Sequence, residues 1–323
     1  MRLRLSQFIH PSSLDMVWSR HAPETTMDHS AYDYDILGDG ADPDELHFEL
    51  FQRISAAMPW KDMLDDYYIE KLSRMVYGSN MIENAGGDLD TTLDICQQIF
   101  EGKQVKGYDS FIKRGHREII QHAKATYYIF DQIIKGKDLS EEMILKTHRI
   151  LTAGIDTEDG IPWAEYSGTY RQHPVRAGLH PFMHEHMVPS AMRQMINSYT
   201  ADVLAAKEKE KIDPVALAAK YCHIFVNIHP FADGNGRICR LILNAILFKY
   251  ARCIVSFGED EEDRELYLHI AADSSLQEVS VNQEDLEDLP DEFKPKCYKK
   301  LASFTLKHAL DGMREILNLE WEG

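Results

Sequence analysis

The sequence HPFADGNGRICR, residues 229–240, joins two helical patterns through a tight turn. Apolar residues recur at helical spacing over about residues 214–228, and a second helical pattern covers about 236–250. Gly234 and Gly236 flank an asparagine where the second helix begins. Backbone N–H groups in such a turn form a concave anion site, which the positive end of the helix dipole strengthens. The stretch therefore predicts a phosphate site at a helix N-terminus.

The charged side chains of this stretch favour a polyphosphate ligand. Arg237 and Arg240 fall in the first turn of the second helix, where the helix dipole disfavours cations. An anion with several charges, such as a di- or triphosphate, would offset that repulsion. Asp233 adds one carboxylate, and Mg²⁺ on a nucleotide is often held by one or two carboxylates and phosphate oxygens. His229 suits a general base because its unperturbed pKa lies near neutrality.

The stretch also matches, at every fixed position, the signature H-P-F-x-[D/N]-G-N-G-R-x-x-R, and in this the chain resembles the Fic (Fido) family. The resemblance implies an all-α Fic fold with a small β-hairpin flap over the active site. It implies transfer of AMP from ATP to a Ser, Thr or Tyr hydroxyl of a target protein, and self-modification, with Mg²⁺ or Mn²⁺ as the metal. In-line attack on the α-phosphorus would release pyrophosphate, with catalysis by positioning and charge stabilisation.

The resemblance assigns a role to each residue of the signature. His229 would deprotonate the acceptor hydroxyl, and Asp233 would bind the metal. The α-phosphate would lie against the backbone of Gly234, Asn235 and Gly236 and the Asn235 side chain, the β- and γ-phosphates would bind Arg237 and Arg240, and Phe231 would anchor the loop in the core. The alternative is an ordinary helical corner, with glycines for geometry and arginines in surface ion pairs.

A second motif, SNMIEN at residues 79–84, fits the family's inhibitory pattern [S/T]-x-x-x-E-[G/N]. The resemblance makes Ser79, Glu83 and Asn84 an inhibitory element in which Glu83 pairs with Arg240 and takes the place of the γ-phosphate. The alternative is a capping serine with a solvated glutamate. We expect a helix over about 61–77 that ends at Gly78, followed by this short separate segment.

Other activities are compatible with the same residues. One is removal of AMP from a modified protein, with Glu83 positioning a water; another is Fic-type transfer of a different nucleotide or phosphate-containing group. Kinase-like relatives carry Lys where this chain has Gly236, so Gly236 favours AMP transfer. A non-catalytic nucleotide-sensing module is the remaining alternative, against which the intact His229 argues.

The long Gly- and Pro-rich segment 154–189 predicts a functional loop. Within it GTYR, residues 168–171, resembles the stretch before the family's flap, which would cover about 173–185 and clamp the target by backbone pairing. The flap positions that follow the motif are His173, Pro174, Val175, Arg176, Ala177 and Gly178. An ordinary surface hairpin is the alternative. His180, His184 and His186 have metal-like spacing, but without a carboxylate or cysteine in register we do not expect zinc there.

Tyr267 matches a family position that lines the adenine pocket, in an R-x-x-Y context with Arg264. The tyrosine that often follows is Leu268 in this chain. Adenine contact and plain packing are therefore both open for Tyr267. A similar choice holds for Asn244, which fits a family position but equally suits a supporting role.

Length and composition limit the remaining possibilities. The chain has 323 residues, with 35 Lys+Arg against 53 Asp+Glu and a net charge of −18, which argues against nucleic acid or an anionic membrane as partner. Five scattered cysteines, no secretory signal pattern and no long apolar run predict a cytoplasmic or nuclear protein. A homodimer is left open.

The chain divides, on its patterns, into four parts. Residues 1–41 are expected to be a flexible tail, 42–139 an N-terminal helical region with the motif 79–84, 140–286 the Fido catalytic core, and 287–323 a C-terminal helical region.

Overall fold

The computed structural model describes residues 2–4, 23–38, 41–57, 61–105, 113–177, 180–280 and 294–318, and its elements are almost all helical. The helices are α3 (Tyr34–Leu37), α4 (Pro43–Ala57), α5 (Lys61–Ile82), α6 (Leu89–Phe100), α7 (Arg114–Ile134), α8 (Glu141–Thr152), α9 (Trp163–Tyr166), α10 (Val188–Glu208), α11 (Pro214–Ile228), α12 (Asn235–Ala251), α13 (Glu261–Ser280) and α15 (Lys299–Asn318). The short strands are β1 (Glu24–Thr25), β2 (Arg176–Ala177), β3 (His180–Pro181) and β4 (Lys211–Ile212). The predicted all-α class is confirmed.

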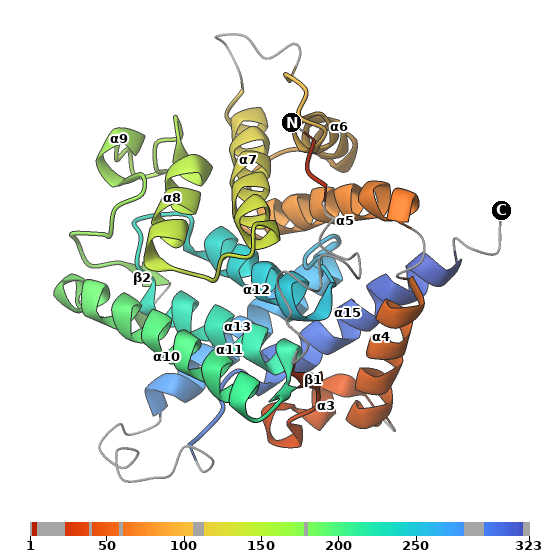
Figure 1. Ribbon diagram of the computed structural model, residues 1–323. Helices are drawn as coiled ribbons and strands as arrows, with labels where there is room; N and C mark the ends of the chain where they lie inside the picture. Colours follow the sequence, from red (N-terminus) through yellow and green to blue (C-terminus); the bar gives the residue numbers. More distant parts are fainter. Residues whose placement is uncertain are drawn as a thin grey trace.

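The centre of the molecule is the antiparallel pair α11 and α12, the two helices that the 229–240 stretch connects (Figure 1). α12 is buried at nearly every position because other helices pack around it. Asp213 caps α11 by accepting a hydrogen bond from the Ala216 backbone N–H at 2.9 Å, and Pro214 occupies the first helical position. The turn for which the sequence predicts a phosphate site therefore lies between two helices of the core.

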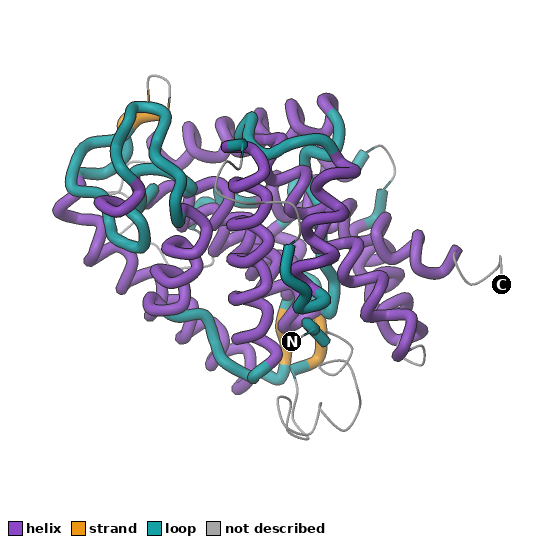
Figure 2. The backbone as a smooth tube through the Cα atoms, turned by 90° about the horizontal axis from the view of Figure 1, so that it is seen from above, coloured by secondary structure: helices purple, strands orange, loops and turns teal. Residues whose placement is uncertain are grey.

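Two groups of helices enclose this pair. On one side α5, α6, α7 and α8 pack in succession, and both α5 and α7 also contact α12. On another side α15 packs against α4, α11 and α13 (Figure 1). Figure 2 shows that helices make up most of the described chain. Contacts therefore cross the sequence boundaries expected at residues 139 and 286.

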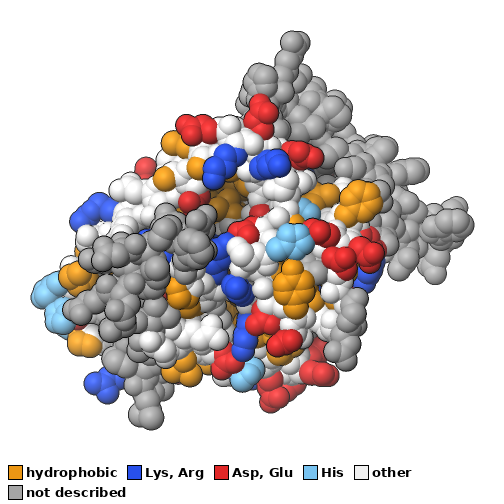
Figure 3. All heavy atoms as spheres, turned by 90° about the horizontal axis from the view of Figure 1, so that it is seen from below, with side chains coloured by type: hydrophobic (Ala, Val, Ile, Leu, Met, Phe, Trp, Pro, Cys, Tyr) orange, Lys and Arg blue, Asp and Glu red, His pale blue; other side chains and the backbone are white. Residues whose placement is uncertain are grey.

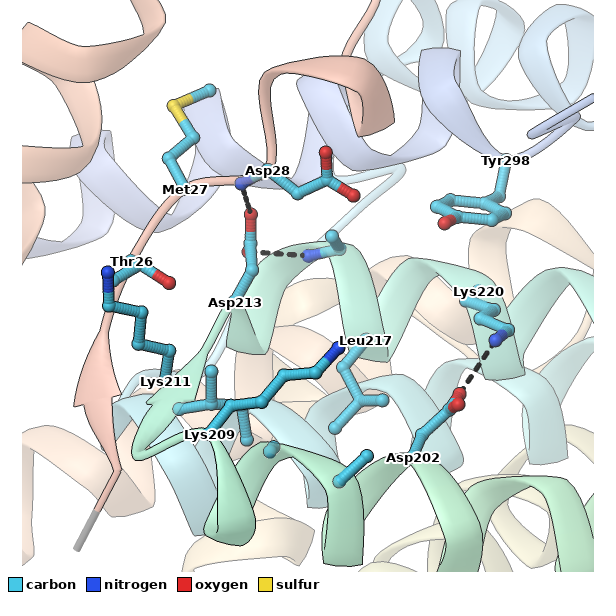
Figure 4. A pocket seen from close by; sticks show the side chains of 14 residues that line it. Thr26, Met27, Asp28, Asp202, Lys209, Lys211, Asp213, Leu217, Lys220 and Tyr298 are labelled. Atoms are coloured by element: carbon cyan, nitrogen blue, oxygen red, sulfur yellow. Dashed lines mark hydrogen bonds and ion pairs between the residues drawn. The ribbon is translucent and has the colours of Figure 1, made fainter. Parts of the chain in front are cut away.

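The N-terminal residues 23–38 are packed against the body, so the flexible tail that we predicted for 1–41 is wrong for this part. β1 pairs in parallel with β4, Glu24 opposite Lys211 and Thr25 opposite Ile212. The buried Tyr32 hydroxyl donates to Asp213 at 2.9 Å. Figure 4 shows residues 26–28 laid along β4 and the start of α11, where the Asp28 backbone N–H donates to Asp213 at 2.8 Å. Long-range pairing, invisible in the sequence pattern, orders this segment.

Gly78 does not end a helix, contrary to our prediction. α5 continues through it to Ile82, and the 79–84 motif forms the last turn of α5 and the residues just after it. A Cβ at Gly78 would lie 2.2 Å from the Phe257 carbonyl oxygen. The glycine therefore serves a close approach of α5 to the 257–258 backbone, rather than a helix stop.

The surface carries charges of both signs. On the face in Figure 3, acidic and basic side chains of the described residues are interspersed. Among the described helices, none combines the length and apolar character needed to cross a bilayer.

Candidate active site

The turn between α11 and α12 is built from two residues in the left-handed region and one bracing amide. His229, with φ 49°, ends α11, and Gly234, with φ 81°, caps α12. The buried Asn235 side chain accepts from the Phe231 N–H and donates to the Phe231 carbonyl, both at 2.9 Å. Both polar atoms of Asn235 are thus turned to the backbone. Our expectation that this side chain binds the α-phosphate does not fit this geometry, which makes Asn235 a brace of the turn.

Phe231 lies fully buried below the turn, in the position that the family resemblance implies for an anchor. Its ring stacks on the imidazole of His148 from α8, with ring centroids 3.6 Å apart. His148 Nδ1 accepts from the Gly168 N–H at 2.9 Å, so its Nε2–H donates to the Asp233 carbonyl at 2.9 Å. Burial lowers the pKa of His148 to about 4, which keeps the ring neutral for both bonds. Sequence reasoning missed this residue because 85 positions separate it from Asp233.

His229 presents one ring nitrogen to the site. Its Nδ1 lies 3.1 Å from the Val226 carbonyl, which can only accept, so Nδ1 carries the proton and Nε2 keeps its lone pair. The Phe182 ring stacks on the imidazole with centroids 3.8 Å apart. Burial lowers the pKa of His229 to about 4, so the imidazole is neutral at pH 7. The arrangement is that of a proton acceptor.

Arg171 ties His229 to the flap, and sequence reasoning did not assign it a role. Its Nε donates to the His229 carbonyl at 2.7 Å and its Nη2 to the Met183 carbonyl at 2.6 Å. The Arg171 backbone N–H also donates to the Pro230 carbonyl at 2.9 Å. Arg171 is buried, so this fan of bonds fixes where the His229 backbone and the flap lie relative to each other.

The flap is the antiparallel pair β2 and β3, with Arg176 opposite Pro181 and Ala177 opposite His180. His173, Pro174 and Arg176 are exposed. Gly178, expected at the turn, lies outside the described residues. Exposed backbone next to His229 offers a segment for pairing with an extended peptide.

The N-terminus of α12 is filled by a carboxylate of the chain itself. A Cβ at Gly236 would lie 2.0 Å from Glu83 Oε1 and 3.2 Å from Arg240 Nη1. Glu83 thus sits on the glycine whose missing side chain leaves room at the anion site. A carboxylate there gains from the helix dipole as a phosphate would.

Arg240 holds this carboxylate and the end of α5. Its Nη2 donates to Glu83 Oε1 at 2.6 Å and to the Ser79 carbonyl at 2.9 Å, while Nε donates to Ser79 Oγ at 2.8 Å. Burial disfavours the charged guanidinium, but the Glu83 carboxylate outweighs it and raises the pKa of Arg240. The sequence-predicted residues Ser79, Glu83 and Arg240 are therefore brought together.

Asn84 and Asn80 hold the Glu83 segment from its other sides. Asn84, with φ 53°, accepts from Arg264 Nη2 at 3.3 Å, and Arg264 Nε donates to the Met81 carbonyl at 3.0 Å. The side-chain Oδ1 of Asn80 accepts from Nδ1–H of the buried His122 on α7 at 2.8 Å. Contacts from two further elements thus fix the segment.

Arg237 and Asp233 have polar atoms that can bind a ligand at the site. Arg237 is 5 % exposed, and its Nε has no hydrogen-bond partner among the described residues. Its Nη2 lies 3.4 Å from both carboxylate oxygens of Asp233, and Asp233 Oδ1 accepts from the Gly234 N–H at 2.6 Å. A buried donor without a partner suits an anionic ligand. The half-buried Asp233 carboxylate is a hard oxygen donor that suits Mg²⁺.

Tyr267 lies behind Arg240. It is buried, it stacks on Phe257 with ring centroids 5.3 Å apart, and the Arg240 guanidinium carbon lies 5.5 Å from its ring centroid. Of the two roles considered for Tyr267, the structure favours packing with support of Arg240 over contact with adenine. Asn244 braces the backbone, since its Oδ1 accepts from the Val255 N–H at 2.8 Å.

Comparison with known proteins agrees with this geometry. The model of the Fic/DOC family matches residues 138–247. The chain is 28 % identical over 237 residues to the protein adenylyltransferase Fic of Nematostella vectensis, covering 71 % of this chain and 49 % of that protein. It is 39 % identical over 83 residues to a Fido domain-containing protein of Dictyostelium discoideum, covering 26 % of this chain and 55 % of that protein. The chain thus spans about half the length of these curated relatives.

Solved structures share the fold. A Fic domain containing signaling protein from Bacteroides thetaiotaomicron aligns with a TM-score of 0.61 at 20 % identity, over 84 % of this chain and 96 % of that chain. Fic-1 from C. elegans aligns with a TM-score of 0.60 at 19 % identity, over 90 % of this chain and 73 % of that chain. Residues 138–247 thus match the Fic/DOC family, and the chain shares its helical fold with solved Fic structures.

Proposed function

We propose that this protein is a protein adenylyltransferase, which moves AMP from ATP to a Ser, Thr or Tyr hydroxyl of a target protein. The observation that carries the proposal is the pairing of a neutral imidazole with an anion site. His229 Nε2 carries a lone pair with no hydrogen-bond partner among the described residues. The Gly236, Arg237 and Arg240 groups that suit a polyphosphate lie on the adjoining first turn of α12. The adenylyltransferase names of the relatives support this chemistry.

The residues take roles that follow from their positions. His229 Nε2 accepts the proton of the target hydroxyl as its oxygen attacks the α-phosphorus. The backbone N–H groups at the start of α12 stabilise charge on the α-phosphate, while Arg237 and Arg240 neutralise the leaving pyrophosphate. Asn235, His148 and Arg171 hold the turn in shape. Asp233 would hold Mg²⁺, which supplies further charge neutralisation for the phosphates.

We propose that the enzyme restrains itself through Glu83. Its carboxylate occupies the space over Gly236 and bonds to Arg240, where the terminal phosphate of ATP would bind. Ser79 uses two further donor directions of Arg240, which fixes the arginine in the closed arrangement. ATP must displace or avoid this carboxylate, so AMP transfer is slow in the wild-type protein.

Removal of AMP is the second candidate, and one observation favours it. Glu83 lies near His229, close enough for its carboxylate to affect the pKa of the imidazole. A carboxylate beside the attacking position could orient a water instead of excluding a nucleotide. AMP addition and AMP removal use the same residues, so an experiment distinguishes them by whether AMP is added to the target or released from it.

The test follows a label from ATP into protein. Glu83→Gln removes the charge of the carboxylate at nearly constant shape, and Glu70→Gln on the preceding helix α5 is the matched control. With ATP labelled at the α-phosphorus we expect label in Glu83→Gln protein and little in wild type or Glu70→Gln. Label from the γ-phosphorus would overturn AMP transfer in favour of a kinase. Loss of label from premodified protein that requires Glu83 would favour the second candidate.

A further inference from the structure

A second cluster of potential metal ligands lies away from the nucleotide turn, and the proposed function makes no use of it. His223 on α11, Glu278 near the end of α13 and Cys297 just before α15 come together from three elements. One nitrogen, one oxygen and one sulfur ligand atom lie within 4.8 Å of one another. Glu278 Oε2 lies 3.0 Å from His223 Nε2.

The chemistry of these donors selects a class of ion. Imidazole, carboxylate and thiolate together match borderline divalent metals such as Zn²⁺, whereas Mg²⁺ and Ca²⁺ prefer oxygen. In a tetrahedral zinc site, ligand atoms at the usual bond lengths are about 3.4–3.6 Å apart. The distance between His223 Nε2 and Glu278 Oε2 is 3.0 Å, and no pair of the three ligand atoms is more than 4.8 Å apart, so small side-chain rotations would bring them into that range.

Burial and charge also suit a bound cation. His223 and Cys297 are 4 % and 7 % exposed, so two donors are already desolvated and held by packing. The Glu278 side chain is 53 % exposed and leaves a path for an ion and for a water as fourth ligand. A thiolate and a carboxylate together neutralise a divalent charge.

We propose that His223, Glu278 and Cys297 form a binding site for one borderline divalent metal ion, with Zn²⁺ as the best match. The ion would join α13 and the start of α15 to α11. His223 lies six residues before His229 on the helix that leads into the nucleotide turn, a rise of about 9 Å. Its effect would be structural, because the ion would hold α13 and α15 against α11.

Another cluster of potential metal ligands lies on the surface of the described chain. His184, Glu185 and His186 also have ligand atoms close together, so a carboxylate does accompany these histidines, contrary to our sequence-based expectation. Glu185 and His186 belong to one turn of 3-10 helix, His184 is its N-cap, and both histidines are exposed. Adventitious surface binding would occur there, so the test removes this cluster first.

The experiment uses the full chain carrying His184→Ala and His186→Ala, stripped of metal with a chelator and titrated with Zn²⁺ and with Co²⁺. We expect one equivalent of metal and, with Co²⁺, a sulfur-to-metal charge-transfer band. Cys297→Ser should abolish the band, and Glu278→Gln should weaken Zn²⁺ binding by more than about tenfold. Cys96→Ser and Glu265→Gln, a second buried cysteine and another exposed glutamate of α13, are the matched controls and should change neither readout.

The outcome is decisive even if one variant folds poorly. Glu278 is exposed on the helix surface, so Glu278→Gln should retain the wild-type circular dichroism spectrum and decide the question if Cys297→Ser does not. Failure of the parent protein to bind a stoichiometric metal ion would overturn the proposal. So would a thiolate band that survives Cys297→Ser or disappears in Cys96→Ser.

Discussion

At the scale of single residues, the site depends on which atoms are already satisfied. Asn235 has both amide atoms bound to Phe231, whereas Arg237 keeps a buried Nε without a partner among the described residues. Asn235 therefore stabilises the turn, and Arg237 has a buried donor that a ligand can bind. The type of residue was visible in the sequence, but the direction of each side chain depends on the local geometry of the turn.

The pH dependence of transfer tests His229. Burial lowers the pKa of its imidazole to about 4, and only the unprotonated ring accepts a proton. In the Glu83→Gln background, the transfer rate should therefore stay nearly constant as the pH falls from 8 to about 5.5 and drop only on approach to pH 4. Single-turnover rates across this range provide the measurement. Half-loss of the rate near pH 6.5, the value for a solvated imidazole, would contradict the assignment.

At the scale of helices and strands, long-range packing determines the structure at the places where the local sequence pattern predicted something else. The sequence patterns predicted most helices correctly, including the pair around residues 229–240. They failed at Gly78, where the close approach of Phe257 explains the glycine, and at residues 23–38, which gain order from β4 and Asp213. Arg171 and His148 were also missed as supports, because their partners lie 58 and 85 positions away.

Two helical glycines provide a matched test of the α5 packing. Gly78→Ala would place a methyl group 2.2 Å from the Phe257 carbonyl, so we expect a loss of about 1–3 kcal/mol in the free energy of unfolding. Gly312→Ala on α15 meets nothing closer than 3.8 Å and should be neutral or stabilising by up to about 1 kcal/mol. Urea unfolding measures both. Equal effects of the two substitutions would refute the close-approach explanation.

Arg171 should act on the alignment of the flap and His229, without contact to the nucleotide. Arg171→Lys keeps the charge but cannot span the carbonyls of His229 and Met183 together. In the Glu83→Gln background, we expect transfer to a target peptide to fall by at least about tenfold. ATP affinity, measured by calorimetry, should stay within about twofold. A large loss of ATP affinity with unchanged turnover would show that the account of Arg171 is wrong.

At the scale of the whole molecule, buried histidines set the response to acid. Burial lowers the pKa values of His47, His148 and His229 to about 4. The unfolded chain therefore binds more protons than the folded one between about pH 6.5 and pH 4, and stability falls as the pH falls through that window. Burial raises the pKa of Asp213 to about 6, which opposes this trend because its contribution is lost as the pH rises through about 6.

Thermal unfolding at several pH values tests this balance. The melting temperature should decrease from pH 6.5 to pH 4, and His47→Leu should make the decrease shallower, since it removes one buried imidazole far along the chain from the nucleotide turn. Each pKa unit corresponds to about 1.4 kcal/mol. His269→Leu, at an exposed position of α13, serves as the control and should change the slope less than His47→Leu. A wild-type protein that gains stability over this window would rule the account out.

Intact-protein mass spectrometry after incubation with ATP and Mg²⁺ tests whether Glu83 restrains the AMP transfer that depends on His229. Wild type, Glu83→Gly and Glu83→Gly/His229→Ala are compared side by side. We expect mass additions of one or more adenylyl groups in Glu83→Gly, few in wild type and none in the double variant. Equal additions in wild type and Glu83→Gly, or additions that persist without His229, would contradict this expectation.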